Sequence, residues 1–428
     1  MPRKGRDSEL GTRDSTKRPR LFLFTVCVLL TLAMCPLQIR AGVAEAPAAN
    51  LRVDLYTYGP GAIYWERFGH DALVVTDTAS GESYAFNYGL FDFNQRDFFL
   101  NFARGRMSYM AAAWPAADDL AQYKDEGRWI VDQQLNLTPR QRGALRDFLV
   151  WNVQPRNARY AYDYYTQNCT TRIRDALDRV LGGVLRAQMQ TRTRAFTYRS
   201  QTDRLMAGQP WLMLILDLGL GAYADQPLNG WSGSFLPTQL MESLRGARTA
   251  AGRPLVVSET RLATARLPAP PETPPDLRWP LLIAGLILGA ALTIACWLRT
   301  HCAVARFAFA FGGALFALFA GAAGLLMAIL WAFTAHRAAW ANENLLLFDP
   351  LALLLIPGLL RLARDGTRAG GFTLRLSMIL TALAAFALLS KTLPGFPQHD
   401  LPWILFALPV WLGLSYGLWR AQSLNIEL

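Results

Sequence analysis

The sequence predicts an α+β extracytoplasmic domain followed by an all-α membrane domain of five helices. Three observations lead to this prediction. Apolar residues make up 52% of the 428 residues and gather in the C-terminal third. A proline-rich stretch at 267–278 separates that third from a less apolar region. Within that region, runs of alternating apolar residues precede runs with apolar residues at three- and four-residue spacing, as expected of strands and helices.

A basic leader precedes the first hydrophobic run, Leu21–Leu37. The first 20 residues hold seven Lys or Arg and three acidic residues, a net charge of +4. This pattern is typical of a signal peptide or signal anchor over residues 1–44. The small residues at 42–44 favour cleavage, whereas the bulky Met34 makes the sequence before Cys35 a poor lipobox.

Four strands are expected in the extracytoplasmic domain, with a short helix at Arg96–Phe102 between the third and the fourth. Together these elements predict a small mixed sheet with helices. The expected strands are Leu51–Thr57, Asp71–Thr76, Ser83–Tyr88 and Trp129–Leu137.

Two helices have clear boundaries. Thr138, Pro139 and Gln141 form a helix start with a cap, a proline at the first position and a glutamine at the third, and this helix should run to about Val153. The second helix begins at Cys169, and glycines 182 and 183 end it. A third apolar run, 210–220, is too short to span a bilayer, so it should form a buried helix or lie at the membrane interface.

Five segments are long enough to cross a membrane. Arginines gather in the first and third loops between them, which by the positive-inside rule places residues 45–278 and the second and fourth loops outside. Much of the formal net charge of +11 therefore lies in the leader and the loops that orient the chain in the membrane, and it does not indicate nucleic-acid binding. The expected spans are about 279–298, 305–333, 345–363, 372–391 and 402–419.

Between residues 45 and 278 the chain has one histidine, His70, and one cysteine, Cys169. Asn168 can cap the helix that Cys169 begins, and the unpaired N–H groups of a first turn favour a thiolate. His70 opens a strand-like run, so the two residues resemble the halves of a papain-like site in the order His then Cys. The alternative is a buried cysteine and a hydrogen-bonded core histidine. An unpaired cysteine outside the cytoplasm is unusual, however, which favours the chemical interpretation.

A third polar group should orient the imidazole. We expect Asn87, on the strand next to that of His70, with Asp71 and Asp92 as competitors; Asn87 could equally head a turn before Gly89. The spacing of the ligand-type residues predicts no metal site, and no cofactor is expected.

Several short motifs follow one another along residues 51–350. They are Phe68-Gly69-His70, Asn87-Tyr88-Gly89-Leu90-Phe91, Phe98 and Phe102 before Gly105 and Tyr109, Asn168-Cys169-Thr170-Thr171, Gly221-Ala222-Tyr223-Ala224-Asp225 with Phe235-Leu236-Pro237, and residues Asn342–Pro350. With these motifs in this order, the chain resembles the Lnb-type periplasmic lipoprotein N-acyltransferase family over most of residues 51–350. The resemblance implies a circularly permuted papain-like domain, similar to lecithin:retinol-type acyltransferases and NlpC/P60 hydrolases, with Cys169 and His70 as the catalytic pair.

The resemblance further implies a periplasmic catalytic domain at 45–266, a linker at 267–278 and a membrane domain at 279–428 in the bacterial inner membrane. The family role is to transfer an acyl chain from a phospholipid, through a Cys169 thioester, to the amine of a diacylated lipoprotein. His399 is expected to be a solvated loop residue. His336, Asn342 and Asn344 lie near helix ends and could instead serve only as helix caps. The expected substrate-binding residues are Asn168, Tyr88, Tyr109, His336, Asn342 and Asn344.

Two other functions fit the same residues. A cysteine hydrolase, such as a peptidase or peptidoglycan amidase, would use the pair with water as acceptor, although such a substrate needs no membrane helices. A non-catalytic membrane scaffold would use Cys169 and His70 only as structural residues. The scarcity of ionisable residues within the apolar segments disfavours a transporter.

Overall fold

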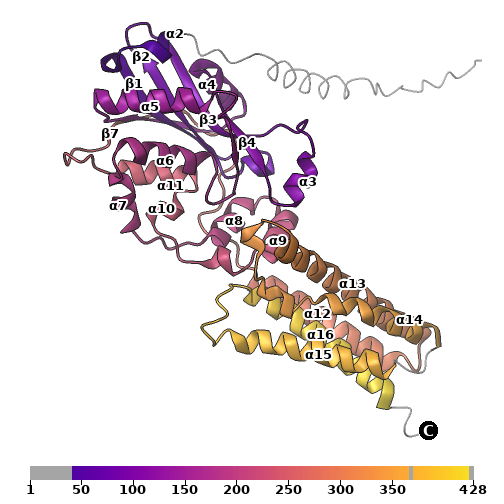
Figure 1. Ribbon diagram of the computed structural model, residues 1–428. Helices are drawn as coiled ribbons and strands as arrows, with labels where there is room; N and C mark the ends of the chain where they lie inside the picture. Colours follow the sequence, from indigo (N-terminus) through magenta and orange to yellow (C-terminus); the bar gives the residue numbers. More distant parts are fainter. Residues whose placement is uncertain (1–40, 366–369, 424–428) are drawn as a thin grey trace, which may run out of the picture.

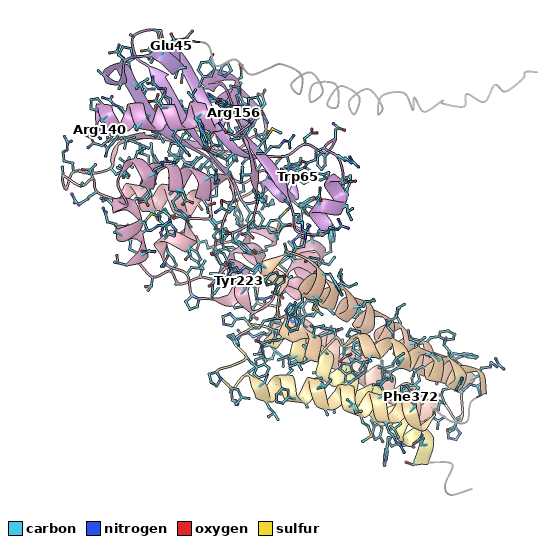
Figure 2. The ribbon with its side chains drawn as sticks, in the orientation of Figure 1. Glu45, Trp65, Arg140, Arg156, Tyr223 and Phe372 are labelled. Carbon is cyan, nitrogen blue, oxygen red and sulfur yellow. The ribbon has the colours of Figure 1, made fainter. Side chains whose placement is uncertain are left out.

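The computed structural model describes residues 41–365 and 370–423, which form two bodies joined by short helices (Figure 1). We call residues 41–266 the sheet domain and residues 278–423 the helical domain. Nearly all of the expected signal segment lies outside the described residues. Tyr223 lies where the two bodies meet, and Phe372 lies toward the far end of the helical domain (Figure 2).

The sheet domain contains one seven-stranded sheet in the order β6-β4-β3-β2-β1-β5-β7. The four expected strands are confirmed, but every pairing is antiparallel, so the expectation of a mixed sheet is wrong. The sequence patterns missed three strands: β4 contains three consecutive alanines, β6 has three residues, and β7 is a polar edge strand. The strands are β1 (Leu51–Tyr58), β2 (His70–Asp77), β3 (Ser83–Leu90), β4 (Ser108–Pro115), β5 (Ile130–Leu135), β6 (Arg159–Ala161) and β7 (Val256–Ala263).

Helices cover both faces of this sheet. Leu73 and Val75 of β2 belong to the core beneath α5 (Pro139–Asn152) and α6 (Cys169–Val180), whereas Ala72 and Val74 pack on the side of α4 (Ala116–Asp125). Because successive side chains of a strand point to opposite faces, His70 lies on the α4 side and Asp71 on the α6 side.

The predicted helix boundaries are confirmed. The Thr138 hydroxyl accepts from the Gln141 N–H, and the Asn168 carboxamide accepts from the Thr171 N–H at 2.9 Å. Gly183, at φ +83°, follows α6 in the left-handed region that favours glycine. The other helices of this domain are α2 (Ala41–Glu45), α3 (Phe98–Ala103), α7 (Val184–Gln190), α8 (Tyr198–Met206), α9 (Pro210–Gly219), α10 (Gly230–Gly233) and α11 (Pro237–Arg245).

Four helices of the helical domain are long and apolar enough to cross a membrane, and a bent pair can make a fifth span. The span expected at about 345–363 corresponds to this bent pair and is broken: Asn342 and Asp349 each cap a short 3-10 helix, and Pro350 follows, so the chain bends by 44° there. The helices are α12 (Arg278–Leu298), α13 (Ala303–Phe333), α14 (Ile356–Asp365), α15 (Gly371–Ser390) and α16 (Leu401–Ser423).

Glycines allow α12 and α16 to pack closely. A Cβ added at Gly289 would lie 2.4 Å from the Pro409 carbonyl oxygen, and one at Gly413 would lie 2.3 Å from the Gly289 carbonyl oxygen. Small residues four apart, here Gly285 and Gly289, are a common way for membrane helices to bring their backbones into contact.

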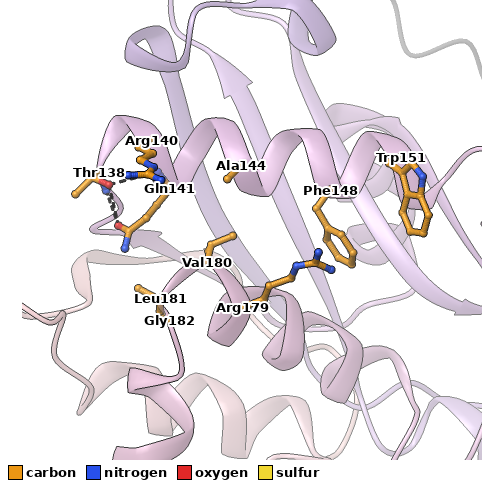
Figure 3. Close-up of a pocket in the computed structure, with 10 residues that line it drawn as sticks. All are labelled: Thr138, Arg140, Gln141, Ala144, Phe148, Trp151, Arg179, Val180, Leu181 and Gly182. Carbon is orange, nitrogen blue, oxygen red and sulfur yellow. Dashed lines mark hydrogen bonds between the residues drawn. The ribbon is translucent and has the colours of Figure 1, made fainter.

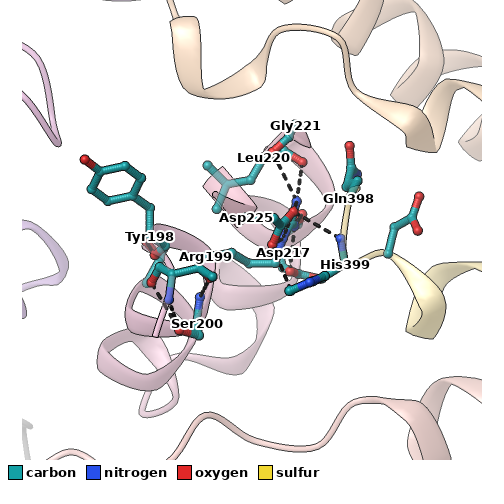
Figure 4. A network of polar contacts seen from close by, with 12 residues as sticks. Tyr198, Arg199, Ser200, Asp217, Leu220, Gly221, Asp225, Gln398 and His399 are labelled. Atoms are coloured by element: carbon teal, nitrogen blue, oxygen red, sulfur yellow. Dashed lines mark hydrogen bonds and ion pairs between the residues drawn. The ribbon is translucent and has the colours of Figure 1, made fainter. Parts of the chain in front are cut away.

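A buried cation holds two carboxylates of the sheet domain in place, and these carboxylates contact the helical domain. The Arg199 guanidinium of α8 donates to the carboxylates of Asp217 and Asp225, at 2.8 and 2.9 Å (Figure 4). The other Asp217 oxygen accepts from the indole N–H of Trp403 in α16 at 2.7 Å, and Asp225 accepts from the backbone N–H of His399 at 3.1 Å. The His399 ring is mostly solvated, as expected, with its Nδ1 3.4 Å from Asp225.

A second set of contacts lies beside this cluster. Asn342 and Asn344 both donate from their side chains to the carbonyl of Leu218 in α9, at 2.9 and 3.0 Å. Leu214 and Leu218 pack against the core of the helical domain, whereas Trp211 and Ile215 remain exposed. The apolar run at 210–220 is therefore a helix at the junction between the domains.

We predict that Arg199→Met strongly destabilises the protein. The substitution leaves two buried carboxylates without their cation, a loss of about 3–5 kcal/mol. Thermal unfolding of the full chain in detergent should show a clearly lower midpoint. Arg140→Met, at an exposed position, is the matched control and should leave the midpoint unchanged. Equal midpoints for the two variants would contradict a stabilising role of the cluster.

Candidate active site

The backbone of β3 passes directly under the first turn of α6. Gly89, at φ +85°, lies so close that an added Cβ would be 3.4 Å from the Cys169 Cβ. The pairing of β3 with β4 is irregular between Asn87 and Leu90, which lets the strand end bend at this point. The Cys169 thiol is thus held at the end of the sheet, and the residue is partly exposed.

His70 and Cys169 come together at this end of the sheet. The backbone N–H groups of Asp71 and Thr170 lie against the sulfur, and the Thr170 hydroxyl is 3.8 Å away. Tyr123, whose ring stacks on the imidazole, is also close enough to Cys169 for a thiolate there to raise the pKa of the Tyr123 hydroxyl further, so the two expected catalytic residues lie in one site. Tyr58 and Tyr123 stack on the imidazole from the α4 side, with ring centroids at 6.1 and 5.8 Å.

A chain of hydrogen bonds extends behind the imidazole. His70 Nε2 lies 2.8 Å from Asn87 Oδ1, and Asn87 Nδ2 donates to Asp119 Oδ1 at 3.2 Å. The Asp119 carboxylate of α4 also accepts from the Trp114 indole at 2.7 Å and from the Tyr58 hydroxyl. Asn87 and Asp119 are both fully buried.

This chain determines which imidazole nitrogen is free. The Asp119 carboxylate only accepts hydrogen bonds, so it orients the Asn87 NH₂ toward itself and the amide oxygen toward His70. An amide oxygen also only accepts, so Nε2 of His70 carries the proton and Nδ1 keeps its lone pair. An imidazole of this tautomer can take a proton from a thiol at Nδ1.

The site holds a neutral thiol and a neutral imidazole at rest. Burial, followed by the charge of Asp71, raises the pKa of the Cys169 thiol to about 11. Burial lowers the pKa of His70 to about 4, against the hydrogen bond to Asn87, which raises it. The expectation of a resting thiolate is therefore wrong: a helix N-terminus contributes only about 0.3–1 kcal/mol, whereas desolvating a charge costs several kcal/mol.

Asp71 contacts the thiol side of the site and not the imidazole side. Its Oδ1 accepts from the Thr57 hydroxyl at 2.8 Å, and burial raises the pKa of this carboxyl to about 7. Its Oδ2 has no hydrogen-bond partner among the described residues. Asp92, the other competitor, accepts from the Asn94 N–H in a loop. Of the three candidates for the third polar group, only Asn87 contacts His70.

Several expected substrate-binding side chains are engaged within the protein. The Tyr88 hydroxyl donates to Asn152 at 2.9 Å in the core, and Asn168 caps α6 while donating to the carbonyls of Tyr164 and Phe235. Asn342 and Asn344 are buried at the domain junction. We assign these four side chains structural roles, because little of their surface can reach a substrate.

Two expected residues do lie along a path from the thiol to the helical domain. Tyr109 stacks on Tyr162, with ring centroids 4.1 Å apart, and Tyr162 lies 6.0 Å from Tyr164. His336, just after α13, stacks on Tyr164 at 6.1 Å. This row of aromatic rings connects the start of α6 with the end of a membrane-length helix.

A pocket of about 770 Å³ lies elsewhere, along α5 and beside the end of α6 (Figure 3). Its lining includes Thr138, Phe148, Arg179 and Gly182. Since Cys169 begins α6 and Arg179 lies in its last turn, this pocket is at the opposite end of the helix from the thiol. It therefore does not belong to the candidate active site.

Two family models match the chain. The Lnb N-terminal periplasmic domain matches residues 42–204, which contain His70, Asn87 and Cys169. The Lnb transmembrane domain matches residues 274–422. The chain is therefore a membrane protein with a periplasmic part. No curated protein and no solved structure matches it.

We predict that Asp71→Asn makes the thiol more acidic. The variant removes the negative charge beside the sulfur, so the pH midpoint for alkylation of Cys169 by iodoacetamide should fall by about one pH unit or more. Asp92→Asn removes a charge from a nearby loop and should leave the midpoint unchanged. A midpoint that does not move in Asp71→Asn would show that this carboxyl is not charged next to the thiol.

A second prediction concerns the positioning role of Asp119. In wild type, nitrogen-15 spectra of histidine-labelled protein should show His70 protonated at Nε2 at pH 7. Asp119→Asn should give a mixture of tautomers, because an amide in place of the carboxylate lets Asn87 turn over. Trp114→Phe removes a different donor to Asp119 and should keep the wild-type tautomer. A spectrum of Asp119→Asn identical to that of wild type would contradict the positioning role.

Proposed function

The chain belongs to the Lnb family, and on that premise we propose that it is a cysteine acyltransferase acting on lipids at the outer face of the inner membrane. Cys169 accepts an acyl chain from a phospholipid and passes it to the N-terminal amine of a diacylglyceryl-cysteine lipoprotein. The observation that carries this proposal is the position of the thiol: it shares the neighbour Tyr123 with the His70 imidazole, and a row of aromatic rings leads from it to the outer end of α13.

The first half-reaction forms a thioester. His70 Nδ1 takes the thiol proton as the sulfur attacks the ester carbonyl of the phospholipid. The C–O bond of the ester then breaks, and the imidazolium returns the proton to the oxygen of the lysophospholipid. The backbone N–H of Cys169, in the first turn of α6, has no carbonyl four residues earlier in the helix to bond, so it can donate to the oxyanion.

The second half-reaction forms the amide. The neutral amine of the lipoprotein attacks the thioester carbonyl, and His70 Nδ1 takes one of its protons. The C–S bond breaks, and the proton passes from His70 to the departing sulfur, which restores the neutral thiol. The same nitrogen serves as base and then as acid in both halves, so the order of steps requires the tautomer that Asn87 and Asp119 favour.

The pKa values of Cys169 and His70 suit a thiol that becomes reactive only when the lipid is bound. A neutral thiol is a poor nucleophile, so the burial that raises the pKa of Cys169 to about 11 protects it from adventitious oxidation in the periplasm. Proton transfer to His70 must then accompany the attack on the carbonyl. A positioned base of this kind contributes about 10²–10⁴-fold to a rate.

We predict that Cys169→Ser and His70→Ala each reduce N-acylation by at least about 10²–10⁴-fold. Purified wild type, phospholipid and a diacylated lipopeptide should yield triacylated lipopeptide and lysophospholipid in equal amounts, measured by mass spectrometry. Cys302→Ser and His301→Ala are matched controls, because both residues are exposed in the loop between α12 and α13. Both controls should retain full activity.

Three outcomes would contradict the proposal. Release of free fatty acid without a triacylated product would indicate a lipid hydrolase. Cleavage of the peptide would indicate a peptidase. Full activity of Cys169→Ser, in a protein that is folded and inserted, would leave Cys169 and His70 with structural roles only.

A further inference from the structure

An open pocket of about 510 Å³ lies where the sheet domain meets the outer end of α13. Arg104 and Arg106 line it from the turn between α3 and β4. The other side is formed by the last turn of α13 and the loop that follows, including Phe333, Thr334 and Trp340.

The turn that carries the two arginines is fixed against α13. Gly105, at φ +71°, lies so close that an added Cβ would be 2.7 Å from the His336 backbone nitrogen. The Ala335 N–H donates to the Arg104 carbonyl at 2.8 Å, and His336 Nε2 lies 2.9 Å from the Phe102 carbonyl, to which it donates. The backbone on both sides of Gly105 is therefore held in one place at the end of the span.

The two guanidinium groups have no partner within the described parts of the chain. Arg128, Arg174 and Arg199 each form an ion pair with a carboxylate, whereas no hydrogen bond, ion pair or ring contact engages the side chains of Arg104 and Arg106. The described residues that line the pocket include no acidic residue. The pocket thus presents two exposed cations to a ligand that must be anionic.

The surroundings of the pocket indicate where that anion comes from. Phe333 ends a 31-residue apolar helix and is 79% exposed, and Trp340 donates its indole N–H to the Thr334 carbonyl. Aromatic rings at the end of a membrane helix lie at the level of the lipid head groups. The anionic group that phospholipids present at this level of a membrane is their phosphate.

The pocket also connects to the thiol. His336 contacts the arginine-bearing turn on one side and stacks on Tyr164 on the other. Tyr164 packs against Tyr162, which is close enough to Cys169 for a thiolate there to raise its pKa further. A lipid whose phosphate occupies the pocket would have its glycerol esters on the side of this aromatic row.

We propose that Arg104 and Arg106 bind the phosphodiester of the acyl-donor phospholipid and position its ester toward Cys169; this rests on the proposed function in taking a phospholipid as the donor. Arginine suits this role because its planar fork can donate two hydrogen bonds to phosphate oxygens. The exposed side chains of Phe99 and Leu100 in α3, next to the pocket, would then lie among the acyl chains.

Lipid binding to the full-length protein tests this site without turnover. In a Cys169→Ala background, native mass spectrometry would compare the affinity for dioleoyl phosphatidylglycerol with that for dioleoylglycerol, which lacks the phosphate. Arg104→Gln with Arg106→Gln should weaken phosphatidylglycerol binding by about ten- to a hundredfold or more, since a hydrogen bond to a charged group contributes about 1.5–3 kcal/mol. Binding of dioleoylglycerol should not change.

Arg96→Gln is the matched control. Arg96 is exposed on the same segment, is paired with Asp97 and does not line the pocket, so its loss should leave both affinities unchanged. Arg104→Lys with Arg106→Lys keeps the charge but loses the planar fork, and it should bind phosphatidylglycerol with intermediate affinity.

Equal weakening of both lipids, or no weakening of either, would overturn the assignment. The assignment would also be overturned if millimolar inorganic phosphate displaced phosphatidylglycerol and the pocket bound the two with equal affinity, because it would then be a site for free phosphate. If the lipid discrimination is found but no acyl transfer occurs, the pocket assignment holds and the proposed function fails. If the double Gln variant instead transfers acyl chains with an unchanged KM for phospholipid, the proposed function holds and the pocket assignment fails.

Discussion

The buried ion pairs of Arg199 with Asp217 and Asp225 hold two carboxylates of the sheet domain against the helical domain, where Trp403 and the backbone of His399 donate to them, and the position of the site depends on this cluster. Tyr198, the residue before Arg199, stacks on Tyr165 at 4.2 Å, and Tyr165 lies four residues before the cysteine. The cluster therefore connects α16 to the segment that leads into α6. Three charges buried at a junction are costly unless they are fully paired, so this arrangement favours one relative placement of the domains. That placement puts the row of aromatic rings beside the thiol against the outer end of α13.

Within the sheet domain, burial decides the chemistry. It raises the pKa of Cys169 to about 11 and lowers that of His70 to about 4, so the proposed reaction starts from a neutral thiol and a proton has to move during the proposed attack. Asp119 affects which imidazole nitrogen is free to take that proton, because it orients the Asn87 amide, whose oxygen in turn accepts from His70 Nε2. A buried carboxyl that never touches a substrate can in this way decide which nitrogen acts as the base. Asp71 acts on the thiol itself: its negative charge favours the protonated sulfur and so raises the pKa of Cys169 further.

Much of the fold and the centre of the site could be predicted from sequence, because local patterns determine them. Apolar residues, alternating in β1 and β3 and continuous in β2, mark these strands, caps and glycines mark α5 and α6, and the scarcity of His and Cys between residues 45 and 278 singles out His70 and Cys169. Asp119 could not be found in this way, since nothing local distinguishes it from the exposed Asp118 beside it. The same holds for Asn342 and Asn344, whose partner lies more than a hundred residues away in α9. The thiol pKa was predicted in the wrong direction because a helix start is visible in the sequence and desolvation is not.

In the proposed function, the arginine pocket at the domain junction binds the phospholipid and Cys169 of the sheet domain accepts its acyl chain. The most direct measurement is intact and peptide mass spectrometry of the full-length protein after brief exposure to phospholipid with no amine acceptor. The account predicts a mass gain of one acyl chain on the peptide that contains Cys169, lost on treatment with neutral hydroxylamine as expected of a thioester. Accumulation of lysophospholipid while Cys169 remains unmodified would contradict it.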